Sequence, residues 1–215
     1  MTTTVPARRR RVPPRWIAAA AVAVLVVLMA VDTEYRTAET AAAAAPKKFD
    51  PAAFGAQNYQ AKVVPAIQQS AVNLPVLLKA LAGDKDAAGQ KYGKRPGSTG
   101  PYTFAVKGTG KAGKARSGLL PVTVEGVPDG TRVSLQIGPA INGTALRDAA
   151  GYITFGQFTN QVEYADAATA LNNELRAKLL NGLDAAALDG KEITFTGAFT
   201  LLTPQTVTIT PVAIT

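Results

Sequence analysis

The stretch PVTVEGVPDGTRVSLQI, residues 121–137, has the pattern of two β-strands joined by a tight turn. Apolar residues take every second position on both sides of the turn, at Val122, Val124, Val133, Leu135 and Ile137. This alternation is typical of strands that bury one face. Between the strands, Pro128 presets a turn dihedral and Gly130 accepts a positive φ.

Further strands are expected on both sides of this stretch. The period of two recurs at Tyr102, Phe104 and Val106. A short strand is predicted at Tyr152–Phe155, and two longer strands are predicted at Glu192–Leu201 and Thr206–Ile214. A helix is predicted from Asp166 to Asn181, where leucines recur on one face. From residue 115 the order is strand, strand, strand, helix, strand, strand. An antiparallel OB-like barrel with one helix between its third and fourth strands has this order, and other small β-barrels fit it too.

Two helices are predicted ahead of the strands. Asp50 and Pro51 form an N-cap followed by proline at the first helical position. Pro65 is expected to kink this first helix. Asn73 can cap a second helix, which carries a stripe at Leu74, Leu77, Leu78 and Leu81. The sequence therefore predicts an α+β fold, in which an N-terminal helical hairpin precedes the antiparallel β-barrel.

An apolar run, WIAAAAVAVLVVLMAV at residues 16–31, follows five arginines near the N-terminus. As a helix it would be about 24 Å long, against about 30 Å of bilayer hydrocarbon. The arginines favour a cytoplasmic N-terminus. We expect a cytoplasmic tail (1–15), a transmembrane signal-anchor (16–31), a stalk (32–48) and an extracytoplasmic α+β domain (49–215). A cleaved secretory signal is the alternative.

Composition excludes several classes of chemistry in this chain of 215 residues. The sequence has no cysteine and no histidine, which removes disulfides, thiol nucleophiles, Ser-His-Asp hydrolysis and nearly all zinc, haem and copper sites. No cofactor and no metal are expected. Of the net charge of +8, residues 1–31 carry five basic and no acidic groups, so the remainder carries only +3. Nucleic-acid binding is therefore not expected.

Two glycine-rich segments resemble nucleotide-binding motifs without meeting their requirements. GTGKAG at residues 108–113 matches G-x-G-x-x-G, but a strand-like segment with Pro121 follows it in place of a helix. We interpret it as a hairpin turn. GQKYGKR at residues 89–95 is one residue too short for a phosphate loop and lacks its Ser or Thr.

Residues 85–116 hold eight basic residues against one acidic residue, Asp86. A solvated loop is one interpretation, and an electrostatic contact with anionic lipid or an acidic partner is the other. Apart from Lys85, the basic residues of this predicted patch are Lys91, Lys94, Arg95, Lys107, Lys111, Lys114 and Arg116.

The segment GPAINGTALRD, residues 138–148, joins two predicted strands and is dense in turn formers and polar groups. It can be a loop that satisfies its own hydrogen bonds, or part of a surface that binds a ligand or a partner. With the polar and aromatic residues that follow it, the binding candidates are Asn142, Thr144, Arg147, Asp148, Phe155, Phe158, Asn160 and Gln161.

No enzymatic motif is apparent. The candidate catalytic carboxylates are Asp129, Asp148, Glu163 and Asp166, and none of the four serines lies in a nucleophile motif. A carboxylate-dependent hydrolase would need two of these groups across one cleft. We expect a protein that is not an enzyme, and keep a hydrolase using Asp148 and Glu163 as an alternative.

Several segments carry a resemblance to a known family: VDT (31–33), FDP (49–51), KYG (91–93), PYTFAVK (101–107), GLLPV (118–122), GPAINGTALRD (138–148), FGQFTNQ (155–161) and GAF (197–199). At these segments the chain resembles an uncharacterised family of bacterial predicted periplasmic lipoproteins, classed as a domain of unknown function. The resemblance implies export, membrane attachment and association with sugar ABC transport systems. It assigns no catalytic residue.

Since this chain has no cysteine, it cannot carry a lipoprotein's lipid, and the apolar run would have to anchor it. The expected function is an extracytoplasmic accessory or binding protein, attached to the membrane and serving an ABC transporter. The alternative is an OB-like module that binds an oligosaccharide or peptide directly, with Tyr152, Phe155 and Phe158 as candidate aromatics.

Overall fold

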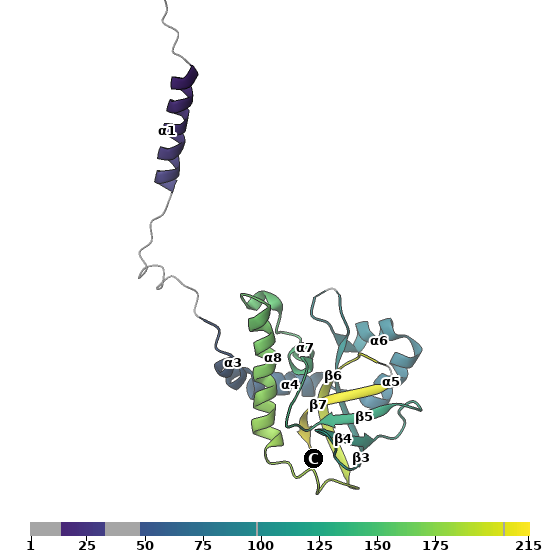
Figure 1. Ribbon diagram of the computed structural model, residues 1–215. Coiled ribbons are helices and arrows are strands. Elements are labelled where there is room, and N and C mark those ends of the chain that lie inside the picture. Colours follow the sequence, from purple (N-terminus) through teal and green to yellow (C-terminus); the bar gives the residue numbers. More distant parts are fainter. Residues whose placement is uncertain (1–13, 33–47, 98, 204) are drawn as a thin grey trace, which may run out of the picture. The chain divides into compact units, whose positions relative to one another are not determined.

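The computed structural model describes residues 14–32, 48–97, 99–203 and 205–215 (Figure 1). The chain divides into two compact units, Met1–Lys48 and Phe49–Thr215. Most of the predicted cytoplasmic tail and stalk lies outside the described residues.

The first unit contains one described helix, α1 (Pro14–Asp32). Large apolar side chains from Val22 to Val31 are more than half exposed on it. Within the described parts of the chain, no helix has the length and apolar character needed to cross a membrane.

Five strands of the second unit pair in a closed ring: β3 (Thr103–Ala112), β4 (Leu119–Thr123), β5 (Arg132–Gln136), β6 (Glu192–Thr200) and β7 (Thr206–Ile214). Their order is β3–β4–β5–β7–β6, and β6 returns to β3 through a long antiparallel pairing. All neighbours in the ring are antiparallel except β5 and β7. Two short strands, β1 (Val72–Asn73) and β2 (Gly93–Lys94), also pair with β3.

The strand predicted at Tyr152–Phe155 is wrong. The helix α7 (Ala145–Ala150) ends at Gly151, which has a φ of 78°, and a 3-10 helix, η2 (Phe155–Gln157), follows soon after. Only Ile153 of this stretch is fully buried. The short apolar pattern therefore reflects one side chain inserted under helices and not a paired strand.

The hairpin turn predicted for GTGKAG is also wrong, since Gly108 and Gly110 lie inside β3. A Cβ on Gly108 would lie 2.8 Å from the Phe195 ring, and one on Gly110 would lie 2.4 Å from the carbonyl oxygen of Thr123. The glycines therefore permit close packing in the strand. Strand β4 follows β3 here, whereas a dinucleotide fingerprint places a helix directly after its glycines.

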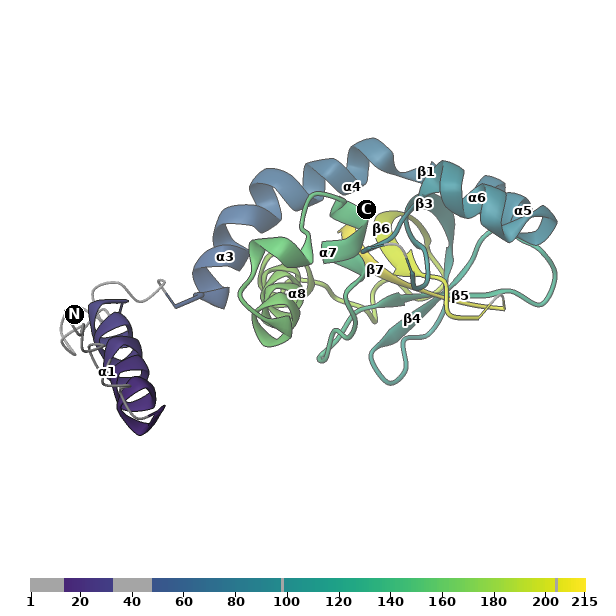
Figure 2. The same ribbon diagram turned by 90° about the horizontal axis from the view of Figure 1, so that it is seen from above.

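Helices precede the ring and interrupt it. The segment α3 (Pro51–Asn58), η1 (Tyr59–Val63) and α4 (Val64–Ser70) is continuous, and Asp50 caps its start. Pro65 lies in the first turn of α4, directly after the π-helical turn η1, so the helical path continues through the proline. Next come α5 (Leu74–Gly83), capped by Asn73, and α6 (Lys85–Tyr92), capped by Asp84. These helices follow one another along one side of the domain (Figure 2). The chain is thus α+β, and the helical hairpin stays a prediction.

Between β5 and β6 the chain forms α7, η2, α8 (Gln161–Leu175) and η3 (Arg176–Leu180). The long helix predicted from Asp166 begins five residues earlier, because Asn160 accepts a hydrogen bond from the Glu163 backbone and so caps it there. Helix α8 packs closely on α3, where a Cβ on Gly55 would lie 3.0 Å from the Ala170 carbonyl oxygen.

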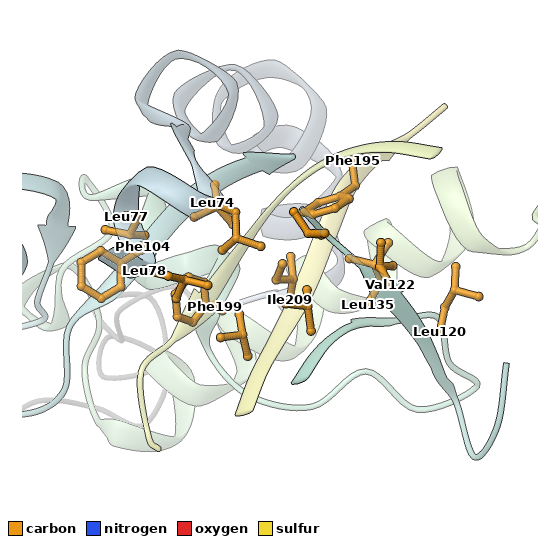
Figure 3. Packing of buried hydrophobic residues seen from close by; sticks show 14 of the residues in the cluster. Leu74, Leu77, Leu78, Phe104, Leu120, Val122, Leu135, Phe195, Phe199 and Ile209 are labelled. Carbon is orange, nitrogen blue, oxygen red and sulfur yellow. The ribbon is translucent and has the colours of Figure 1, made fainter. Parts of the chain in front are cut away.

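Two apolar clusters form the core. The first lies between the ring and α5 and combines strand residues such as Phe104, Phe195 and Ile209 with Leu74 and Leu77 (Figure 3). The second joins the outer side of the same strands to α4, α7 and α8, through residues such as Ile67, Leu146 and Leu171. The second cluster holds α7 and α8 in place, and these two helices carry the site described next.

Candidate functional site

A pocket of about 570 Å³ lies where the segment after β2 meets α7, η2 and the start of α8. This volume is in the usual range for small-molecule sites. Lys94 ends β2 and Arg95 follows it, Arg147 and Asp148 come from α7, Phe155 from η2, and Gln161 and Tyr164 from α8. Residues far apart in the sequence therefore converge on one concave surface.

An ion pair between neighbours on α7, Arg147 and Asp148, lies at this pocket. Arg147 Nε donates to Asp148 Oδ1 at 2.8 Å, and Nη2 lies 2.8 Å from the same oxygen. The Thr144 hydroxyl donates to Asp148 Oδ2 at 2.6 Å. The two residues are only 6% and 8% exposed. Both carboxylate oxygens are thus occupied, as a buried charge requires.

The remaining side of the Arg147 guanidinium faces α8. Nη1 donates to the backbone carbonyl of Tyr164 at 2.9 Å, and the guanidinium carbon lies 3.5 Å from the centre of the Tyr164 ring. This is a cation–π contact. Arg147 therefore ties α7 to the first turn of α8 and fixes the Tyr164 ring beside the pocket.

Tyr164 has an unusual environment. Burial raises the pKa of its phenol, the Arg147 charge lowers it, and Asp148 raises it. Its buried hydroxyl has no hydrogen-bond partner among the described residues, and the same holds for Tyr152. Tyr164 lines the pocket, while its hydroxyl is buried.

Phe155 provides an apolar wall. Its side chain is 49% exposed, and its ring meets the Tyr164 ring edge-on at 5.7 Å. Ile153, which belongs to the second core cluster, also lines the pocket. Behind Tyr164, Phe158 packs against Phe49 and Phe54. This aromatic group holds the wall rigid without filling the pocket.

Two basic residues, Lys94 and Arg95, form a basic edge of the same pocket. Lys94 is exposed, and a Cβ on Gly151 would lie 3.4 Å from its Cδ and Cε atoms, so its stem passes over the end of α7. The Arg95 guanidinium lies 4.0 Å above the Tyr102 ring and donates to the Tyr102 hydroxyl. A Cβ on Gly89 would overlap that ring at 2.4 Å. The segment GQKYGKR thus ends α6 and makes room for Tyr102.

The eight predicted binding residues have different places. Arg147, Asp148, Phe155 and Gln161 line the pocket. Thr144 supports Asp148, Asn160 caps α8, and Phe158 packs in the aromatic group. Asn142 pairs through its backbone with the Gln136 side chain, away from the pocket.

Sequence reasoning missed Tyr164, Ile153 and Tyr102 as parts of the site or its support. Tyr164 follows Asn160 by four residues, so a helix start at Asn160 would have placed it one turn into α8, on the same side as the cap. Tyr152, Phe155 and Phe158 lie on loops and η2, not on the strand faces where an OB-like site was expected.

The residues of the predicted basic patch lie in several separate places on the structure. Lys94 and Arg95 lie at the pocket, whereas Lys107 and Lys111 point from β3 into a separate groove of about 780 Å³. Lys91 stacks on Tyr92 at 4.9 Å. Lys114 and Arg116 follow the end of β3, where the Arg116 backbone pairs with Leu119.

The candidate carboxylates do not gather at the pocket in the described chain. Asp148 lines it, but the Glu163 carboxylate accepts from the Thr159 backbone at the start of α8. No cluster of three or more potential metal ligands occurs among the described residues.

Comparison with known proteins supports the architecture. A crystal structure of an OB-fold protein from Thermotoga maritima superimposes with a TM-score of 0.61 at 21% identity, covering 79% of this chain and 99% of that one. That likeness concerns the fold alone. The search of curated proteins gives no match. The family described as predicted periplasmic lipoprotein (DUF2291) matches residues 21–215. Its description agrees with the expected export and membrane association. Because this match covers most of the chain, the protein belongs to the family of predicted periplasmic lipoproteins of unknown function.

Proposed function

We propose that the unit Phe49–Thr215 is a non-enzymatic extracytoplasmic binding module, and that the pocket between Lys94 and Phe155 is its ligand site. One observation carries the proposal. The buried Arg147–Asp148 pair, Thr144 and the Tyr164 ring form a rigid support under an open pocket of about 570 Å³. Preorganised polar groups beside an exposed aromatic ring are typical of small-ligand sites.

The arrangement favours binding over catalysis. Asp148 is buried, and its oxygens accept hydrogen bonds from Arg147 and Thr144, as is usual for a carboxylate with a structural role. One oxygen of Glu163 accepts from the Thr159 backbone at the start of α8. A hydrolase using Asp148 and Glu163 is therefore the weaker proposal.

The test is to identify what the protein carries. The full chain is purified in mild detergent from its native membrane, and small molecules released on denaturation are identified by mass spectrometry. We expect a compound that wild type retains and Phe155→Ala loses. Val76→Ala, which removes an exposed apolar side chain on α5 outside the pocket, is the matched control. Equal retention by Phe155→Ala and wild type would contradict the proposal.

We also propose that the apolar segment 16–31 holds the module at the membrane and that it works beside an ABC transporter. The exposed side chains of α1 support the first part. A chain lacking residues 1–48 should leave the membrane fraction, while the full chain resists a high-salt wash. Release of the full chain by salt would contradict attachment through this segment.

The second part has its own test. Crosslinking in native membrane should recover transporter subunits with the full chain.

The closed ring supports a finer structural proposal, namely an OB-like barrel with α7 and α8 between its third and fourth strands. The pairing order and the Thermotoga maritima neighbour support it. A groove of about 780 Å³ runs over β3 and β6, where the hydroxyls of the cross-strand neighbours Thr109 and Thr194 are hydrogen-bonded at 3.1 Å. Oligosaccharide or peptide binding there is the second candidate. Titration with a cello-oligosaccharide and a mixed peptide library should then respond to Lys111→Glu, and no response would exclude this groove.

A further inference from the structure

The pocket has a charge balance that selects among ligands. Arg147 and Asp148 neutralise each other, and their hydrogen-bonding atoms are directed at one another, at Thr144 and at Tyr164. The other charged groups that line the pocket, in the part of the chain the structure describes, are Lys94 and Arg95. The buried pair therefore adds no net charge to the pocket, and the remaining charged groups of its lining are basic.

The basic groups are held at the basic edge of the pocket. The stem of Lys94 passes over Gly151, and no ion pair of its ammonium occurs among the described residues. Arg95 is fixed against Tyr102 by stacking and by a hydrogen bond. A guanidinium held in this way loses little side-chain freedom on binding an anion. Lys94 contributes an exposed point charge next to it.

The rest of the lining has a different character. Phe155, Ile153 and Tyr164 add apolar and aromatic surface to the same pocket. A ligand that uses both parts of the lining carries an anionic group and a ring. The pocket volume suits a molecule of one or two rings.

We infer that the ligand is a compact organic anion, whose carboxylate or phosphate lies at Lys94 and Arg95 while its ring packs on Phe155. This inference rests on the proposed function and narrows its ligand class. Charge attraction at a partly exposed site is modest. We therefore expect the anionic group to distinguish a charged ligand from its neutral analogue, and the ring to contribute most of the buried apolar surface.

The experiment compares matched probes on the full chain in non-ionic detergent by calorimetric titration. Glucuronate is compared with glucose, and benzoate with benzyl alcohol, so each pair differs in its charge. Glucose 6-phosphate and inorganic phosphate separate phosphate from carboxylate as the anionic group. We expect at least one anion to bind about tenfold more tightly than its neutral partner, and to weaken as salt is added.

Variants locate the effect. Lys94→Gln should weaken the anion about fivefold and leave the neutral partner unchanged, whereas Lys107→Gln in the other groove should change neither. Phe155→Ala should weaken both members of a pair. Equal binding of anion and neutral partner would overturn the inference but leave the binding site standing. If no probe binds, the inference is wrong, and the Phe155-dependent retention of a native compound still decides the proposed function separately.

Discussion

At the scale of single residues, the Arg147–Asp148 pair dominates the site. Two adjacent helix residues of opposite charge are both buried, which is stable only because each polar atom has a partner. Their sequence neighbours explain this: Thr144 lies one turn before Asp148, so its hydroxyl reaches the second carboxylate oxygen. The pair serves to fix Tyr164 beside the pocket.

Arg147→Met should therefore destabilise the protein by about 3 kcal/mol, because it leaves the Asp148 carboxylate buried without its cation. Chemical denaturation of the full chain in detergent measures this free energy. The double variant Arg147→Met/Asp148→Leu removes both charges and should recover most of the loss. If the double variant is as unstable as the single one, the cost comes from lost packing and not from an unpaired charge.

Gly110 tests close packing within β3. In Gly110→Ala the new Cβ would lie 2.4 Å from a backbone oxygen of β4, which cannot move without disturbing the ring. We expect a loss of about 2 kcal/mol in the free energy of unfolding. Gly156→Ala is the control, since nothing lies within 4 Å of its Cβ position, and it should change stability by less than about 0.5 kcal/mol. Equal effects of both changes would refute the steric argument.

At the scale of elements, the start of α8 decides where the site lies. Asn160 caps the helix, so Gln161 and Tyr164 occupy its first turn and face the pocket. Asn160→Ala should cost about 1 kcal/mol of stability, while Asn160→Ser should stay within a few tenths of wild type. Thermal and chemical unfolding measure both. A loss in Asn160→Ser as large as that in Asn160→Ala would indicate that Asn160 acts through some other contact.

The same element shows what sequence could and could not predict. The strands around the Val127–Gly130 turn and the two C-terminal strands were predictable, because alternation and turn chemistry are local. The N-cap pattern at Asn160 is local too. A polar side chain at this position fits a ligand site as well as a helix cap, so the sequence alone does not separate the two roles. Gly108 and Gly110 read as turn residues in sequence, and only the approach of Phe195 and β4 explains them. The convergence of Lys94, Arg147 and Phe155 depends on tertiary packing and has no local signal.

At the scale of the whole molecule, stability should depend on alkaline pH through buried tyrosines. Burial raises the pKa of Tyr59 strongly, and the nearby Glu174 carboxylate raises it further. Burial likewise raises the pKa of Tyr152 and Tyr164. In the unfolded chain these phenols ionise near pH 10, whereas in the folded state they ionise at a higher pH. Their stabilising contribution is therefore complete below pH 10 and declines as the pH rises above it.

Tyr59 alone should lower the free energy of unfolding by about 1.4 kcal/mol for each pH unit above 10, since the unfolded state releases one proton that the folded state retains. Urea unfolding at pH 8, 10 and 11 measures this slope, and Tyr59→Phe should make it shallower by that amount. Tyr92→Phe, which removes the hydroxyl of a half-buried tyrosine at the end of α6, provides the matched control. Tyr59 lies at the junction of α3 and η1, within the second core cluster. If Tyr59→Phe leaves the slope unchanged, the alkaline loss of stability must begin elsewhere in the domain.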